Sequence, residues 1–475
     1  MQPDITALGI DLSAIAPLLV LSGTAMLVLV LGLFLKKEQR NLLTWLSLLG
    51  LAGTAAAVVI SLGAVRLAFS NMLTIDSFYA FFALLSIVVT AITVVLSATY
   101  IERIGLPQAE YLGLLLFGAA GMVVMACASN LIVLLIGLEL LSLALYVLAG
   151  FARTRFTSEE AALKYFLLGS FSLGLLIYGT ALVYGETGTL DYAGIAKATQ
   201  SLPEPGLMLM VGMGLILVGF AFKLSLVPFH MWVPDVYEGS PTPVTAYMAV
   251  GTKAIMFAAL MRALAVAFPP VRTEWAAILA VLAALTMIWG NVAAVVQSNI
   301  KRLLGYSAIS HAGYVLMGLV AGGNLANEAV LFYLVAYTAM NFGAFAVIVA
   351  VGGGREERLD LSDYAGLAKT NPWLAASMAI FMLSLAGVPF TAGFLAKLYV
   401  FSAAIQGGYL WLAVVGALTS VVAFYYYLKV VAKMYMAAPS SDTIGFKPSF
   451  SMATVLVITL FFTLQLGILP SLFHF

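Results

Sequence analysis

The sequence contains very little charge for its length. Only 9% of its 475 residues are Asp, Glu, Lys or Arg, whereas soluble domains contain about 25%. So few charged side chains cannot cover a water-exposed surface, and 63% of the residues are hydrophobic. Most of the outer surface is therefore expected to face lipid. The net charge of +1 also excludes the basic footprint of a nucleic-acid-binding protein.

Cysteine and histidine are scarce as well. The one cysteine, Cys127, lies in an apolar run and cannot form an internal disulfide, and no CxxC motif is present. The three histidines are too few and too scattered to predict a metal site. The first twenty residues contain acids but no basic residue, which does not fit a cleaved signal peptide.

Long hydrophobic runs fill the chain instead. They are about 20 residues each, the length that crosses a bilayer as a helix, and they do not alternate as the strands of a membrane barrel do. We therefore predict an all-α polytopic membrane protein of about 14 helices in a single membrane domain, 1–475. The predicted spans are 13–35, 42–62, 76–99, 111–128, 130–150, 162–184, 207–229, 241–266, 275–297, 302–321, 328–350, 373–401, 408–434 and 451–472.

The basic residues predict the orientation, because loops on the inner side of a membrane are enriched in Lys and Arg. If the loop after the first span is inside, fourteen of the 22 basic residues fall in inside loops and four in outside loops. Both termini are then expected outside, which in a bacterium is the periplasmic side of the inner membrane. The inside set is Lys36, Lys37, Arg40, Arg103, Arg153, Arg155, Lys301, Arg302, Arg355, Arg358, Lys369, Lys429, Lys433 and Lys447, and the outside set is Arg66, Lys197, Arg262 and Arg272.

Two halves of the chain resemble each other. Residues 144–150 (ALYVLAG) and 312–318 (AGYVLMG) share five of seven positions, and a Val-Pro-Phe triplet follows in each half. The shared order predicts two five-helix repeats at 111–266 and 267–434, with three helices in 1–110 and one in 435–475. Because five is odd, the second repeat crosses the membrane in the opposite direction, as in many transporters.

The two prolines of these triplets predict discontinuous helices in spans 7 and 12. A proline inside a helix removes a backbone hydrogen bond, and in lipid the freed carbonyl groups need protein or water partners. Pro228 follows Lys223, and Pro389 precedes Lys397. A simple kink is the alternative, but a lysine near each proline favours a broken helix beside a hydrated cavity.

Ionisable side chains lie inside several spans, where each costs about 2.5–3.5 kcal/mol. Glu139 is the one acid in the middle of a span, and Lys223 is a natural partner of opposite charge. A change in their separation would switch the protonation of the lysine. Together with Lys253, His311 and Lys397, the pair suggests a chain of groups that carries protons parallel to the membrane.

Three further ionisable residues could belong to this chain of groups, but each also has a purely structural explanation. Lys164 follows two glutamates and could only snorkel to the surface, Lys301 could anchor the inside end of its span, and His230 could face a wet loop. In span 10 no carboxylate mirrors Glu139, because the aligned residue is Ser307.

Four long stretches resemble the antiporter-like subunits of respiratory complex I, and the N type of bacteria most closely. The chain stops after its last span, whereas the L type has a long extension, and it has Lys397 where the M type has a glutamate. The cyanobacterial and plastid counterpart is also similar. The four stretches are 161–179, 219–248, 297–319 and 389–404.

The resemblance implies fourteen helices, inverted five-helix repeats and broken helices 7 and 12. It implies that Glu139 and Lys223 are the family's glutamate–lysine pair, that Lys253 is its central lysine and that Lys397 lies near the far half-channel. Less certain positions of the same polar axis are Lys164, His230, Lys301 and His311.

The family is proposed to use redox energy released in other subunits, and no redox motif is visible here, so we expect no cofactor in this chain. The expected partners are an antiporter-like M subunit, small K- and J-type subunits, the lipid bilayer and protons, with no nucleic acid. Three alternatives stay open. They are a subunit of a multisubunit cation/proton antiporter, a passive membrane scaffold whose charges are locked in pairs, and a solute symporter. The symporter is disfavoured because no substrate pocket is apparent in the sequence.

Overall fold

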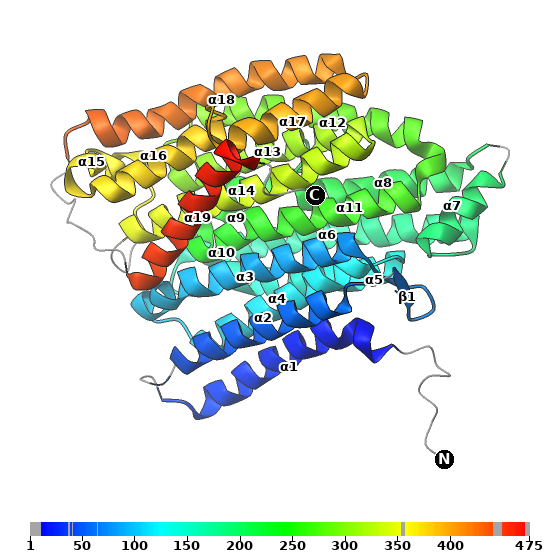
Figure 1. The fold of residues 1–475 in the computed structure, drawn as a ribbon, viewed down its shortest axis with the longest axis horizontal. Helices are drawn as coiled ribbons and strands as arrows, with labels where there is room; N and C mark the ends of the chain where they lie inside the picture. The colour runs from blue at the N-terminus through cyan, green and yellow to red at the C-terminus, as the bar shows by residue number, and fades with distance from the viewer. Residues whose placement is uncertain are drawn as a thin grey trace.

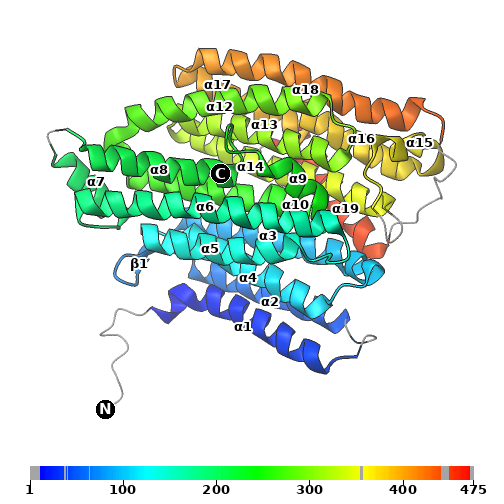
Figure 2. The same ribbon diagram turned by 180° about the vertical axis from the view of Figure 1, so that it is seen from behind.

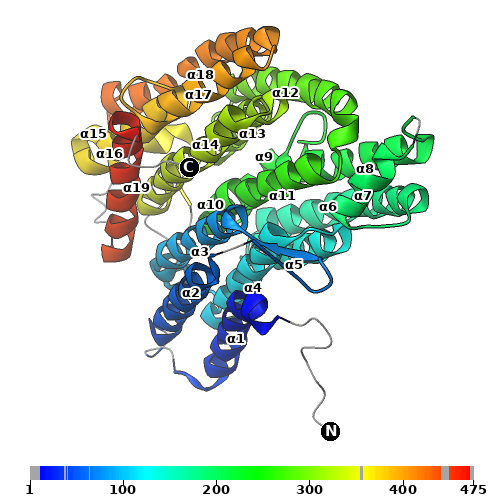
Figure 3. The same cartoon turned by 45° about the vertical axis from the view of Figure 1, so that its right-hand side comes forward.

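A computed structural model describes residues 11–36, 39, 41–63, 65–202, 204–352, 357–439 and 449–470. Within them the chain forms a bundle of helices lying side by side, with α1 (Leu12–Phe34) at one edge and α18 (Leu410–Met436) at the other (Figure 1). The last helix, α19 (Phe450–Ile468), crosses one face of the bundle and packs on α14, α16 and α17 (Figure 3). Four residues of the predicted inside set lie outside the described residues: Lys37, Arg40, Arg355 and Lys447.

The predicted spans are confirmed as helices. In the described part of the chain, 13 helical segments are long and apolar enough to cross a membrane. Two shorter apolar helices, α16 and α17, take the place of the predicted span 12. The helices of the first half are α1, α2 (Asn41–Ser61), α3 (Ser77–Ile104), α4 (Gln108–Cys127), α5 (Leu131–Ala149), α6 (Phe156–Thr187), α7 (Tyr192–Gln200), α8 (Leu207–Leu224), α9 (Trp232–Gly239), α10 (Thr242–Tyr247), η3 (Met248–Thr252) and α11 (Lys253–Val266).

The second half continues with η4 and ends with α19. Its helices are η4 (Pro269–Val271), α12 (Arg272–Val295), α13 (Ile300–Ala321), α14 (Asn324–Val351), η5 (Leu361–Tyr364), α15 (Leu367–Thr370), α16 (Pro372–Ala386), α17 (Ala392–Gln406), α18 and α19.

Two small elements in connecting loops were not predicted. The strands β1 (Arg66–Ala68) and β2 (Leu73–Ile75) form an antiparallel hairpin between α2 and α3. The short helix α7 lies beyond the ends of α6 and α8, at the same end of the bundle as the hairpin (Figures 1 and 2). Strands of three residues are too short for an alternating pattern to be read from the sequence.

The inverted repeat is visible in matching backbone contacts. In the first half the N-cap residue of α5, Asn130, pairs with Asp191, which follows α6. In the second half the N-cap residue of α13, Asn299, pairs in the same antiparallel way with Asp360, which follows α14. The two contacts lie in loops that the predicted topology places on opposite sides of the membrane, as an inverted repeat requires.

In each repeat, a glycine lets the first two helices of that repeat approach each other closely. A Cβ on Gly121 of α4 would stand 2.6 Å from the carbonyl oxygen of Gly137 in α5. In the second repeat a Cβ on Gly290 of α12 would stand 2.7 Å from the backbone nitrogen of Ser310 in α13. Small residues at such contacts let helix backbones approach in membranes, where packing replaces the hydrophobic effect.

Three helical segments form the interior of the bundle. In α13 and α14, 94% of the most apolar window is buried, and in the segment from Thr242 to Val266 the share is 89%, compared with 28% for α1. The buried ionisable groups on these segments, Lys253, Lys301 and His311, are therefore surrounded by protein.

Candidate functional site

Span 7 breaks after Leu224, as predicted. Ser225 takes a left-handed conformation with φ of 64°, and Val227 donates its N–H to Thr286 Oγ1 at 2.9 Å. The indole Nε1 of Trp232 donates to the carbonyl oxygen of Phe222 at 3.0 Å. Side chains thus satisfy backbone groups that the break has freed, which is the condition for irregular backbone within a membrane.

Span 12 breaks in the same way after Ala386. Gly387 has φ of 93°, a conformation that favours glycine. The amide of Gly393, near the start of α17, donates to Ser384 Oγ at 3.1 Å. The carbonyl oxygen of Ala386 accepts a hydrogen bond from Lys397 Nζ at 2.8 Å. In this repeat a predicted site residue, Lys397, itself donates a hydrogen bond to a backbone carbonyl at the break.

Five of the predicted groups are buried, whereas Glu139 is half-buried. Each of the five is no more than 5% exposed, although each belongs to a helix of a membrane bundle. These groups are Lys223, Lys253, Lys301, His311 and Lys397.

Lys223 lies in the last turn of α8, just before the break. Its Nζ donates to Ser142 Oγ at 2.8 Å and to Tyr146 OH at 3.2 Å, both on α5. The same atom lies 5.2 Å from the ring centroid of Tyr146 and 5.5 Å from that of Tyr165. Aromatic faces and hydroxyl groups hold the ammonium in position without a full negative charge.

Glu139 lies on α5, one turn before Ser142. Its Oε2 is buried and has no hydrogen-bond partner within the described part of the chain. No ion pair within 4.0 Å joins Glu139 to Lys223 among the described residues. The expected partners therefore do not form an ion pair in the described structure, and Ser142 and Tyr146, on the same helix as Glu139, bind the lysine in place of the carboxylate.

Lys253 lies where span 8 changes its helical geometry. The π-helix η3 ends at Thr252, and α11 begins with Lys253. The Nζ of Lys253 donates to the carbonyl oxygen of Ala308 in α13 at 2.5 Å. A π-helical turn inside a helix frequently marks a functional position, and no feature of the sequence predicted this one.

His311 connects α13 to α14 and α18. Its Nδ1 lies 2.7 Å from Tyr333 OH, and its Nε2 lies 3.1 Å from Tyr427 OH. Tyr427 also hydrogen-bonds to Ser307, the residue aligned with Glu139. An imidazole with a hydroxyl group at each nitrogen can accept a proton on one side and release it on the other.

Lys397 continues the series on α17. Besides the Ala386 carbonyl it donates to Ser420 Oγ at 2.8 Å, and its Nζ lies 5.1 Å from the ring centroid of Tyr314. The Tyr314 ring in turn lies 5.9 Å from that of His311. Its hydroxyl bonds to Thr419 on α18 at 3.2 Å. The axis therefore extends from His311 to Lys397 through tyrosines that the sequence analysis did not single out.

Several buried polar atoms beside these groups have no hydrogen-bond partner within the described ranges of the chain. They include Ser240 Oγ, whose residue binds Lys301, Thr252 Oγ1 next to Lys253, and Tyr337 OH, whose ring lies 5.1 Å from that of His311. Buried polar atoms are nearly always hydrogen-bonded, and buried water commonly supplies the missing partner. These groups give the interior beside Lys253, Lys301 and His311 a polar lining.

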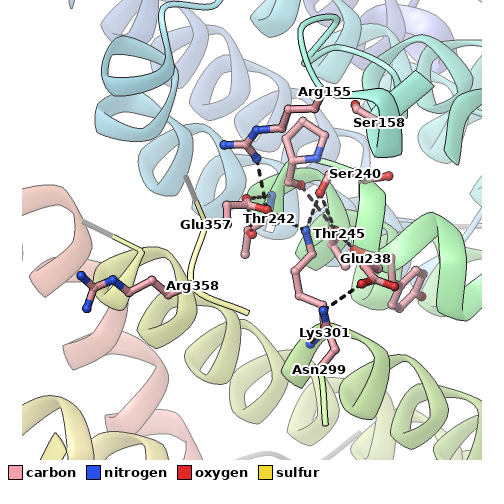
Figure 4. Close-up of polar contacts among 12 residues, drawn as sticks. Arg155, Ser158, Glu238, Ser240, Thr242, Thr245, Asn299, Lys301, Glu357 and Arg358 are labelled. Carbon is pink, nitrogen blue, oxygen red and sulfur yellow. Dashed lines mark hydrogen bonds and ion pairs between the residues drawn. The ribbon is translucent and has the colours of Figure 1, made fainter. Parts of the chain in front are cut away.

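Lys301 lies apart from the other lysines, at the end of the bundle predicted to be inside. Its Nζ donates to the carbonyl oxygen of Ser240 at 2.6 Å and lies 3.2 Å from Glu357 Oε2. Figure 4 shows Lys301, Arg155 and Thr242 converging on Glu357. Burial raises the pKa of the Glu357 carboxyl, but the charge of Lys301 and hydrogen bonds outweigh this effect and lower the pKa to about 2. Glu357 was missed because it lies in a loop.

Two of the predicted positions are more exposed. Lys164 is 40% exposed and forms ion pairs with Glu160 at 2.7 Å and with Asp235 at 2.6 Å, so it is placed as the snorkelling alternative requires. His230 follows the break in span 7 and is half-buried. Its Nδ1 has no partner in the described residues, and its ring lies 6.0 Å from that of Trp289.

Comparison with known proteins identifies the family. Residues 128–423 match the family described as NADH:quinone oxidoreductase/Mrp antiporter, TM. The NADH-quinone oxidoreductase subunit N of Trichlorobacter lovleyi is 45% identical over 464 residues, which cover 98% of this chain and 95% of that protein. The subunit N of Chloroflexus aggregans is 42% identical over 471 residues, covering 97% and 95%.

Solved structures agree with this assignment. A chain of respiratory complex I from Thermus thermophilus matches with a TM-score of 0.82 at 37% identity, covering 96% of this chain and 98% of that chain. A chain of the Mrp complex from Dietzia matches with a TM-score of 0.85 at 22% identity, covering 98% and 96%, which shows the shared fold alone. The chain belongs to the family of NADH-quinone oxidoreductase subunit N.

Proposed function

We propose that this chain is the N-type membrane subunit of an NADH:quinone oxidoreductase and that it moves protons across the membrane. The observation that carries the proposal is the row of buried ionisable groups Lys223, Lys253, His311 and Lys397, of which the three lysines lie on spans that are broken or contain a π-helical turn. Hydroxyl groups, rings and backbone carbonyls hold these groups, which leaves them free to gain and lose protons.

The proposed route runs parallel to the membrane plane. Protons are taken up from the inside near Lys223, pass Lys253 and His311, and leave to the outside near Lys397. Glu139 controls the charge on Lys223, because a carboxylate that approaches an ammonium favours its protonated form and one that withdraws weakens it. The direction of transfer follows from the family resemblance.

The redox reaction is placed in other subunits, and no cofactor is assigned to this chain. Its proposed partners are an antiporter-like M subunit and the small K- and J-type subunits, within a bacterial inner membrane with both termini outside. Conformational or electrostatic changes in those neighbours would alter the separation of Glu139 and Lys223.

A passive scaffold with locked charge pairs is disfavoured by the contacts. No ion pair with a carboxylate within 4.0 Å is formed by Lys223, Lys253 or Lys397 among the described residues. A purely structural lysine would be expected to have such a partner, because an unpaired buried charge is costly. The likeness to the Mrp chain at 22% identity shows the fold and gives no separate reason to assign cation/proton antiport.

The test replaces Glu139 or Lys223 by alanine in the complete complex reconstituted in proteoliposomes. We expect proton pumping per NADH oxidised to fall sharply in both variants, while native electrophoresis shows the assembled complex. Lys197→Ala, which removes an exposed lysine from α7, is the control and should pump normally. Normal pumping in both Glu139→Ala and Lys223→Ala would remove this pair from the mechanism.

A further inference from the structure

The second repeat has no carboxylate at the position of Glu139, yet the structure supplies one from elsewhere. Ser307 occupies the equivalent position in α13. A different glutamate, Glu357, reaches the start of the same helix from the loop after α14 and lies 3.2 Å from Lys301. Lys301 is fully buried and Glu357 is 10% exposed, so this pair is shielded from water.

Glu357 joins segments that are far apart in the sequence. Its Oε2 lies 3.3 Å from Arg155 Nη1, in addition to Lys301. Its Oε1 accepts hydrogen bonds from Tyr100 OH at 2.6 Å and from Thr242 Oγ1 at 2.6 Å and backbone N at 3.2 Å. Thr242 is the first residue of α10, where the helix dipole favours a negative charge. One carboxylate thus connects the inside ends of α3, α10 and α13.

Other charged and titratable side chains surround the pair without replacing Glu357. Arg103 and Tyr364 lie near enough to interact electrostatically with the Glu357 carboxylate, and Glu238 with the Lys301 ammonium. Arg358, the next residue in the chain, points away from the group (Figure 4). Among the described residues, Glu357 is the one carboxylate within 4.0 Å of Lys301.

The pair lies at the inside end of the helix that carries the central groups. Ala308, whose carbonyl binds Lys253, is seven residues further along α13, about 10 Å along the helix axis. Ser240 Oγ and Tyr237 OH, two polar atoms without a hydrogen-bond partner in the part of the chain that the structure describes, line the region at the inside end. A Cβ on Gly305 of α13 would stand 3.6 Å from the Tyr237 ring, which places that ring between Lys301 and Ala308.

We propose that Glu357 and Lys301 form a second carboxylate–lysine pair, the counterpart of Glu139 and Lys223, that controls proton uptake from the inside into α13. The Lys301 ammonium holds its proton while the Glu357 carboxylate is in contact. When the carboxylate withdraws, the Nζ–H bond breaks and the proton passes to interior water toward Lys253 and His311. Lys301 then takes a new proton from the inside. Glu357 is a positioning residue in this step, and the inference rests on the proposed function.

The test is Glu357→Gln in the complete complex in proteoliposomes, because glutamine keeps the shape and hydrogen-bonding capacity but loses the charge. We expect proton pumping per NADH oxidised to fall by at least about fivefold, the lower end of usual coupling between linked sites. Asp360→Asn removes an exposed carboxylate from the same loop and should pump normally. Tyr100→Phe removes one hydrogen bond to Glu357 without changing charge and should reduce the ratio less than Glu357→Gln.

Each result decides the matter. If Tyr100→Phe lowers the pumping ratio as much as Glu357→Gln, Glu357 is a structural tie and the proposal is overturned. If Glu357→Gln pumps normally while Lys223→Ala does not, this inference fails and the proposed function stands. If both pump normally, the proposed function itself fails. Should Glu357→Gln not assemble, Lys301→Gln is measured in its place, and normal pumping there overturns the proposal.

Discussion

Replacing Lys253 by methionine should separate transport from stability, because the structure predicts different effects on the two. Among the described residues, the Lys253 ammonium makes one hydrogen bond, to the carbonyl oxygen of Ala308. Ala308 lies in the middle of α13, where its carbonyl also accepts the backbone N–H four residues further on. Methionine is of similar length and apolar, so Lys253→Met leaves that carbonyl satisfied.

The size of the stability effect follows from two opposing contributions. A lysine near the centre of a membrane helix costs about 2.5–3.5 kcal/mol. A hydrogen bond from a charged group contributes about 1.5–3 kcal/mol. The difference predicts a Lys253→Met protein between about 0.5 kcal/mol less stable and about 2 kcal/mol more stable than the unmodified protein, on the same scales.

Transport should be lost although stability changes little or increases. Without the central proton-binding group, pumping per NADH oxidised in proteoliposomes should fall below about a tenth, which corresponds to a barrier raised by more than about 1.4 kcal/mol. Stability is measured by heating the purified complex before native electrophoresis. Lys369→Met, which removes an exposed lysine, is the matched control. A Lys253→Met complex that pumps normally would refute the assignment of Lys253 to the proton path.

Three further predictions follow from the positions of single charges. Lys164→Ala should change the free energy of unfolding by less than about 1 kcal/mol and leave pumping near normal, because exposed ion pairs contribute little; a loss of pumping would place Lys164 on the path. Because the pKa of Glu357 is lowered to about 2, its charge stabilises the folded state above the ordinary carboxyl pKa of 4.5 and this contribution disappears as the pH falls toward 2. The difference in thermal stability between the unmodified complex and Glu357→Gln should therefore be constant from pH 8 to pH 5, and a difference that vanishes within this window would contradict the ion pair. A cysteine at position 369 should react with a membrane-impermeant reagent from the inside and one at position 197 from the outside, against a low background because native Cys127 is buried; the reverse pattern would invert the predicted topology.

The spans could be predicted because lipid imposes a simple rule on each of them. A helix that crosses the membrane must be apolar along its length, so α5, at Leu131–Ala149, ends within one residue of the predicted range. The two breaks could be predicted because proline and a nearby lysine conflict with a regular apolar helix. The π-helix at Met248–Thr252 could not, because its residues do not differ in kind from those of an ordinary helix.

The charged residues of the candidate site could be predicted from the sequence, but the side chains that contact them could not. Lys223 stands out in an apolar run, whereas Ser142 and Tyr146 carry no charge and are common in membrane helices. Glu357 lies in a charged loop, where a glutamate has the usual appearance of a solvated residue. Its burial results from the meeting of α3, α10 and α13, and only the tertiary structure brings those helices together.

Replacing Lys397 by methionine should affect stability differently from replacing Lys253, although both are buried lysines on the same proposed path. Lys397 donates to the carbonyl oxygen of Ala386, the last residue of α16, and the chain leaves the helix at Gly387. No backbone N–H donates to this oxygen among the described loop and cap hydrogen bonds. Lys397→Met would therefore leave a buried carbonyl unsatisfied, which costs about 1–3 kcal/mol.

We accordingly expect Lys397→Met to be less stable than Lys253→Met by about that amount in the same heating assay, with pumping lost in both. Lys397→Arg keeps a charged donor for the Ala386 carbonyl, but a guanidinium does not release its proton in proteins. Lys397→Arg should therefore also fail to pump, so the charge alone is not sufficient. Normal pumping by Lys397→Arg would show that Lys397 acts as a fixed charge, because proton release from that side chain would then be unnecessary.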